Sequence, residues 1–196
     1  MQPLFAPTRE YRHHTLDSTR WDSFQPRPDD VIIVTPYKSG TTWMQQIVGL
    51  MLLWPDLPAA GVRSQSPWVD ARWNGPVEDV LEELEAQQHR RFIKSHLAAD
   101  GLPFWAEISY IVVGRDLRDI FMSLWNHYSN HTEEAFEFMN GGDRPGPPLP
   151  HAPKDERTLW KDWATRGWFP WEYDGWPYWS STHHLATWWE HRHRPN

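Results

Sequence analysis

Cysteine is absent from this chain of 196 residues, which excludes disulfide bonds, thiolate metal sites and cysteine nucleophiles. The longest apolar stretch, "IVGLMLLW", is far shorter than the roughly 20 residues that a membrane-spanning helix needs. Basic residues number 19 against 26 acidic ones, and the net charge of -7 disfavours broad contacts with nucleic acid or an anionic membrane. The N-terminus lacks the basic start and apolar core of a signal peptide. We therefore expect a soluble cytoplasmic protein that has no membrane span and binds no nucleic acid.

The pattern along the chain indicates a single domain over residues 1–196, with no internal repeat. Residues 1–30 are polar and rich in proline, and we interpret them as an N-terminal arm with one short helix. Residues 140–153, "NGGDRPGPPLPHAP", predict a flexible Gly/Pro-rich loop that could act as a lid. Tryptophan dominates the segment after this loop, whose end has the pattern of an amphipathic helix.

Three apolar segments predict the strands of a sheet. They cover residues 31–35, 91–96 and 109–116, and the first is an uninterrupted β-branched run of the kind found in strands buried on both faces. Helical patterns lie between the first two strands and after the third. Strands that alternate with helices are typical of a parallel sheet. We therefore predict an α/β protein with a central parallel sheet flanked by helices.

Two helical patterns predict how their helices pack. Between Thr41 and Trp54 apolar side chains cover nearly the whole circumference, which predicts a deeply packed helix. After the third strand, apolar side chains repeat at helical spacing and predict one packed face; they are Leu117, Ile120, Phe121, Leu124, Trp125 and Tyr128. Ligands of parallel α/β sheets bind outside the carboxyl ends of the strands. Those ends carry Lys38, Lys94, His96 and Arg115.

The segment "TPYKSGTTW", residues 35–43, lies where the first strand turns into a helix. Such a turn presents backbone N–H groups and a helix N-terminus to an anion. Lys38 adds a positive charge, and Ser39, Thr41 and Thr42 add hydroxyl donors. The Walker pattern is absent because the lysine precedes the only glycine, so a plain nucleoside triphosphatase is disfavoured. Taken alone, the segment fits either an anion site or a solvated turn with an ordinary helix cap.

"KSGTTW" after a strand resembles the 5′-phosphosulfate loop of the soluble sulfotransferases that use 3′-phosphoadenosine 5′-phosphosulfate (PAPS). The resemblance implies that Lys38 contacts the phosphosulfate and that Trp43 stacks on adenine. The residues that it implies for the cradle of the phosphosulfate are Ser39, Gly40, Thr41 and Thr42. Many family members have proline directly before the lysine, whereas here Tyr37 stands between Pro36 and the lysine.

The segment "VVGRDLRDIFMSLWNHY" resembles the 3′-phosphate motif of the same family, in which a strand, an arginine and a helical serine follow one another. The resemblance implies that Arg115 and Ser123 bind the 3′-phosphate. An arginine suits this role because its planar fork binds phosphate through two hydrogen bonds. Asp119 could orient the basic side chains or simply pair with Arg115 or Arg118. Without the resemblance, the same residues read as surface charges and a minor helical serine.

The segment "FIKSH" resembles the family's strand that ends in a lysine and a histidine two residues apart. Alternation places Lys94 and His96 on the same side of that strand. The resemblance implies that His96 removes the proton of the acceptor hydroxyl and that Lys38 and Lys94 stabilise the transferring sulfonate. The remaining histidine clusters, at residues 13–14, 183–184 and 191–193, have no spacing that compels a metal site, and we expect them at the surface.

These motifs together imply a PAPS-dependent sulfotransferase with a three-layer P-loop-like fold and no metal. The segment "SPWVDARWNGPVEDVLEELEAQQHRRFIKSH" resembles bacterial glycolipid sulfotransferases, which implies a glycolipid or carbohydrate hydroxyl as acceptor. The family's C-terminal part has no counterpart here, so we expect a truncated chain whose open sheet edge a homodimer would cover. Two alternatives stay open: a catalytically silent nucleotide-binding remnant, and a P-loop kinase, which the lysine–glycine order disfavours.

Overall fold

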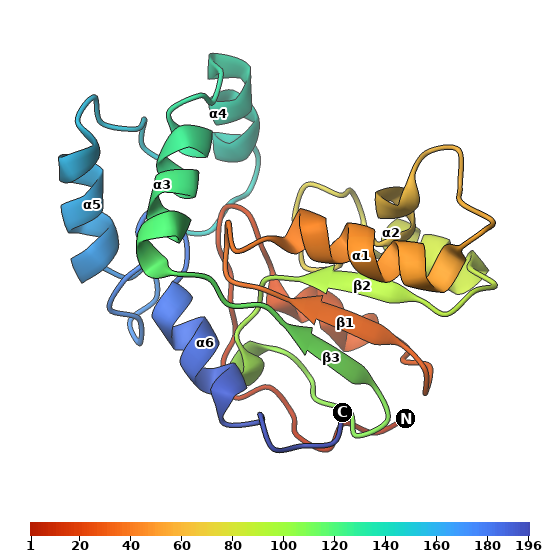
Figure 1. Ribbon diagram of the computed structural model, residues 1–196. Helices are drawn as coiled ribbons and strands as arrows, with labels where there is room; N and C mark the ends of the chain where they lie inside the picture. The colour runs from red at the N-terminus through yellow and green to blue at the C-terminus, as the bar shows by residue number, and fades with distance from the viewer.

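A computed structural model describes residues 1–196 and places a three-stranded parallel sheet inside the domain (Figure 1). The strands are β1 (Val31–Val34), β2 (Phe92–Ser95) and β3 (Ser109–Val112), in the order β2-β1-β3. The three predicted strands are confirmed, although each is shorter than its segment. Because β1 pairs in parallel with both neighbours, the carboxyl ends of all three strands lie at one edge of the sheet.

The strands send alternate side chains into two separate cores, one on each face of the sheet. Val31 and Ile33 pack in the smaller core, whereas Ile32 and Val34 pack in the larger one. All four side chains are buried, which explains why β1 is apolar at every position. The sheet is therefore the middle of three layers, and the predicted α/β architecture with a flanked parallel sheet is confirmed.

The domain has six α-helices: α1 (Thr41–Leu53), α2 (Val77–Ala86), α3 (Leu117–Tyr128), α4 (Glu133–Asn140), α5 (Glu156–Thr165) and α6 (Ser181–Trp189). Three short 3-10 helices, η1 (Ser18–Ser23), η2 (Val62–Gln65) and η3 (Ala99–Gly101), lie in the connections. In Figure 1 the strand arrows point toward the half of the molecule that holds α3, α4 and α5. The buried positions of α3 form one face, as its periodicity predicts. No helix combines the length and the apolar character that crossing a bilayer requires.

Helix α1 is packed on one side only, so the prediction of a deeply packed helix is wrong. Its buried side carries Gln45 and Gly49, where the Gln45 amide donates to the carbonyl and hydroxyl of Ser66. At Gly49 an added Cβ would lie 2.7 Å from Val62, so only glycine allows this close approach. The apolar side chains that face outward instead are Trp43, Ile47, Leu50, Met51 and Trp54. Apolar residues on every side of a helix cannot indicate which side meets the sheet.

Residues 1–30 pack against the domain along most of their length. Tyr11 and Trp21 belong to the large core, and the backbone of Phe5 pairs with that of Phe104. The chain between α4 and α5, which includes the Gly/Pro-rich loop, forms no helix or strand. Two hydrogen bonds hold this loop at Leu149: the Asn140 amide donates to the Leu149 carbonyl, and the Leu149 N–H donates to the Asn140 side-chain oxygen.

Three histidines that the sequence places at the surface are buried. They are His13, His14 and His184. Burial lowers the pKa of His184 to about 3 and that of His14 to about 3, so both rings are neutral at pH 7. The prediction of surface exposure is wrong for these three residues because a neutral imidazole can pack among aromatic rings. The ring centroids of His13 and Trp168, for example, lie 4.3 Å apart.

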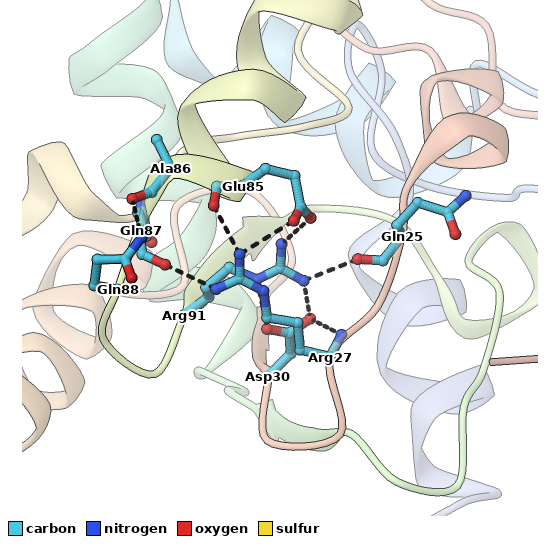
Figure 2. Close-up of polar contacts among 8 residues, drawn as sticks. All are labelled: Gln25, Arg27, Asp30, Glu85, Ala86, Gln87, Gln88 and Arg91. Atoms are coloured by element: carbon cyan, nitrogen blue, oxygen red, sulfur yellow. Dashed lines mark hydrogen bonds and ion pairs between the residues drawn. The ribbon is translucent and has the colours of Figure 1, made fainter.

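A buried ion-pair network joins the amino ends of β1 and β2, at the opposite edge of the sheet from the strand carboxyl ends (Figure 2). Arg91 precedes β2 and donates to both carboxylate oxygens of Asp30, at 2.7 Å and 2.5 Å. It also donates to Glu85 at 2.6 Å and to the carbonyl of Gln25 at 2.9 Å. Neither Arg91 nor Asp30 exposes any of its side chain. The network therefore ties helix α2 and the N-terminal segment to the sheet.

Candidate active site

One cavity of about 920 Å³ opens at the carboxyl edge of the sheet. Every residue that the sequence singles out lines it: Lys38, Ser39, Gly40, Thr41, Thr42, Trp43, Lys94, His96, Arg115 and Ser123. They come from the turn after β1, the end of β2 and the segment that runs from β3 into α3. The cavity volume lies within the roughly 300–1,000 Å³ that is usual for small-molecule sites. Folding thus brings together residues that are distant in the sequence.

The cavity also has lining residues to which the motif resemblances assign no role. They are Tyr37, Met44, Ile47, Trp68, Trp73, Val113, His127, His131, Met139 and Tyr178. One of them had a signal in the sequence, because His127 follows Ser123 by four residues and so shares its face of α3, whereas His131 lies beyond the end of that helix. The others reach the cavity through tertiary packing.

The turn after β1 has the backbone geometry of an anion site. Lys38 has a φ of 64° and Gly40 a φ of 109°, both in the left-handed region that residues other than glycine rarely adopt. No side chain caps the N–H groups in the first turn of α1, and the residues of that turn, Thr41, Thr42 and Trp43, line the cavity. The Ser39 hydroxyl is buried and has no hydrogen-bond partner. An anion bound here would satisfy these donors.

Two positive charges flank this turn. The Arg115 guanidinium donates to the Lys38 carbonyl at 3.2 Å and lies 3.8 Å from the Asp119 carboxylate. Burial lowers the pKa of Lys38, and the charge of Arg115 lowers it further. Ser123 lines the same cavity from the middle of α3. Two cations held this close favour an anionic ligand that binds between them.

The His96 imidazole is held in one tautomer. Its Nδ1 lies 2.7 Å from the Thr35 carbonyl, and because a carbonyl only accepts, Nδ1 carries the proton and donates it. The Thr35 hydroxyl lies 3.1 Å from the same nitrogen. Burial, and next the charge of Lys94, hold the pKa of His96 well below its usual 6.5. At neutral pH, Nε2 is therefore an unprotonated acceptor on a residue that lines the cavity.

Lys94 lies on the face of the Trp68 ring, with Nζ 3.9 Å from the ring centroid. The Trp68 ring also meets the His96 ring edge to face, with centroids 4.9 Å apart. Burial lowers the pKa of Lys94 to about 8; the nearby Asp70 carboxylate opposes this shift. Lys94 is thus still mostly charged at pH 7, but close to losing its proton.

The buried Asp70 carboxylate holds Trp68 and His96 in place, although the motif resemblances assign it no role. Its carboxylate accepts from the indole N–H groups of Trp68 and Trp21, at 2.7 Å and 3.1 Å, and from the His96 backbone at 3.3 Å. Burial raises the pKa of Asp70, and these hydrogen bonds oppose the rise. Asp70 therefore positions Lys94 through Trp68 and positions His96 directly.

Replacing Asp70 with asparagine should lower the pKa of Lys94 from about 8, because the attraction that favours its charged form is lost. The pKa is measured by NMR titration of the lysine Nζ resonance. The Asp79→Asn variant is the matched control, since Asp79 lies exposed on α2. An unchanged Lys94 titration in folded Asp70→Asn protein would contradict the coupling.

Comparisons with known proteins identify the family of this chain. A family profile described as "Sulfotransferase domain" matches residues 28–196. A glycolipid sulfotransferase of Mycobacterium tuberculosis is 38% identical over 202 residues, which cover 95% of this chain and 61% of that protein. The chain belongs to the sulfotransferase domain family. Human sulfotransferase 1C2 is similar at 28% identity over 79% of this chain and 53% of its own length.

Two solved structures confirm the fold. A mouse sulfotransferase, SULT7A1, complexed with PAP has a TM-score of 0.58 at 22% identity, over 89% of this chain and 52% of that one. A retinol dehydratase in a complex with retinol and PAP has a TM-score of 0.55 at 19% identity, over 91% and 55%. The chain thus spans about three fifths of the length of its glycolipid sulfotransferase relatives and about half the length of these structures.

Proposed function

We propose that this sulfotransferase chain binds PAPS and transfers its sulfuryl group to a hydroxyl of a glycolipid or carbohydrate, with His96 as general base. The observation that carries the proposal is the single cavity in which the phosphosulfate turn, the Lys94–His96 pair and the Arg115–Ser123 pair meet. Membership of the family supports the reaction class. The names of the mycobacterial relatives support the acceptor class.

The cavity fits the proposed donor in three ways. The unpartnered Ser39 hydroxyl and the uncapped first turn of α1 offer donors for the 5′-phosphosulfate. Arg115 and Ser123 offer a second anion site for the 3′-phosphate, adjacent to Lys38. The Trp43 ring is 79% exposed at the cavity wall, which leaves its face free to stack on adenine.

The residues of the cavity divide the work of sulfuryl transfer. Bound PAPS would supply an activated sulfuryl group with charge spread over its oxygens. His96 Nε2 accepts the proton of the acceptor hydroxyl while that oxygen forms its bond to sulfur. As the bond between sulfur and the 5′-phosphate oxygen breaks, that oxygen keeps the electron pair. Lys38 balances the resulting negative charge on the leaving phosphate. Lys94 and the N–H groups of the turn hold the sulfonate oxygens, as in an oxyanion hole.

Calorimetric titration of the chain with adenosine 3′,5′-bisphosphate tests the donor site. We expect micromolar affinity, about -8 kcal/mol, and at least tenfold weaker binding of 5′-AMP, because only the bisphosphate engages Arg115 and Ser123. The Arg115→Ala variant should bind both nucleotides alike. Arg157→Ala is the control, since Arg157 is exposed on α5, outside the cavity.

The outcomes of this titration separate the candidate functions. Binding of the bisphosphate together with sulfuryl transfer supports the proposal. Binding without transfer to any hydroxyl acceptor would leave a catalytically silent nucleotide-binding module. A preference for ATP with a requirement for Mg²⁺ would favour a kinase. If the folded chain binds no nucleotide, the proposed function is wrong.

A further inference from the structure

The cavity has a second histidine group that the proposed chemistry does not use. His127 and His131 line it with their rings 4.8 Å apart. His127 follows Ser123 by four residues on the same face of α3, and His131 lies just beyond the C-terminal end of that helix at Tyr128. The histidine pair therefore adjoins the proposed donor site at Ser123 in the same cavity.

The pair lies close to the proposed base. The Tyr37 ring contacts both groups: its centroid is 5.8 Å from that of His96 and 6.0 Å from that of His127. His131 Nε2 lies 3.3 Å from the Tyr178 hydroxyl, and the Tyr178 ring stacks on Tyr37 at 4.6 Å. By contrast, the His127 ring makes no hydrogen bond to the protein although it lines the cavity.

We infer that His127 and His131 bind hydroxyl groups of the acceptor and select a polyhydroxylated acceptor, a sugar headgroup, over a simple phenol. This inference rests on the proposed function, because it assigns the acceptor class of the same cavity. A sugar that presents one hydroxyl to His96 carries neighbouring hydroxyls, and a phenol carries none. Those neighbouring hydroxyls meet the histidine pair.

The chemistry of the pair matches hydroxyl groups. Burial, and next the charge of Lys38, lower the pKa of His127 to about 4, and the same causes lower the pKa of His131. A neutral imidazole offers one donor and one acceptor, as a hydroxyl does. Another cavity residue, Trp73, is partly exposed and supplies aromatic surface on which a sugar ring packs.

Saturation-transfer NMR tests this inference without requiring turnover. Methyl β-glucopyranoside and 4-methylphenol are each titrated into the chain in the presence of adenosine 3′,5′-bisphosphate. For the His127→Phe variant we expect the glucoside to bind about tenfold more weakly, whereas binding of the phenol changes less than threefold. His127→Asn, which keeps a donor and an acceptor, should restore most of the glucoside binding. His193→Phe is the control, because His193 is exposed and outside the cavity.

Each outcome decides the inference. A selective loss of glucoside binding, rescued by asparagine, supports it. Equal losses for both acceptors, unchanged glucoside binding in His127→Phe, or no glucoside binding to the parent chain would overturn it. The bisphosphate titration is read in the same samples, so a failed donor site, which refutes the proposed function, is distinguished from a wrong acceptor assignment.

Discussion

The His96→Gln variant should transfer the sulfuryl group about 100- to 10,000-fold more slowly than the parent chain, the range that a general base typically contributes. Glutamine keeps a polar side chain but cannot take up a proton at neutral pH. The affinity for adenosine 3′,5′-bisphosphate should stay within threefold, because the phosphate contacts come from the turn after β1 and from Arg115. Initial rates with labelled PAPS and calorimetric titration measure the two quantities.

The pH profile supplies the complementary result. The pKa of His96 lies well below 6.5, so the base stays unprotonated and kcat/KM for the donor should not fall as the pH is lowered through 6.5. On the alkaline side, kcat/KM should fall above about pH 8, where Lys94 loses its proton and its charge. His193→Gln is the control for substitution of a histidine. If His96→Gln retains more than a tenth of the parent rate, His96 is not the base.

The Arg91→Met variant should lose about 3–5 kcal/mol of its free energy of unfolding, because removal of one partner leaves a buried charge uncompensated. Asp30 would keep one hydrogen bond, from the Arg27 backbone, in a site with no exposure to water. The network lies at the amino end of the sheet, away from the cavity, so the folded fraction should bind nucleotide with unchanged affinity. Urea unfolding at low temperature measures the loss.

Two further variants sharpen this test. Arg157→Met makes the same substitution at an exposed position and should cost less than about 1 kcal/mol. The double variant Asp30→Leu and Arg91→Met removes both charges and should recover most of the stability, because apolar pairs of similar volume often replace buried ion pairs without loss. A loss below about 1 kcal/mol in Arg91→Met would show that the buried network contributes little.

Local sequence was sufficient to predict the strands and the turn after β1, and the family resemblance added the candidate site residues. The run "VIIV" is typical of a strand buried on both faces, and the glycine with its neighbouring lysine and hydroxyls indicates a strand-to-helix turn. Parallel strands bring their carboxyl ends to one edge. The meeting of Lys38, Lys94 and Arg115 at one cavity followed from that rule. Their roles toward the donor stay predictions.

Features that depend on distant contacts could not be predicted in the same way. The uniform apolar pattern of α1 suggested burial all round, yet its packed side is set by Gly49 and Gln45 against η2 and its following residue, Ser66. The buried histidines were missed because burial of a titratable group depends on its surroundings. Asp70 carries no local signal either, since its three donors come from residues 49, 2 and 26 positions away.

The sequence by itself determined the three strands, the family resemblance and the placement of cations after each strand, because these follow from apolar runs and from short motifs. The resemblance implies His96 as the base, but only the tertiary structure fixes the tautomer of its imidazole and places it at the cavity. His96 and His184 are both buried and neutral, but only His96 meets the Thr35 carbonyl, which fixes its tautomer, and lines the cavity. The protonation state and tautomer of a histidine depend on the groups that surround it, and for His96 those groups come together only when the chain folds.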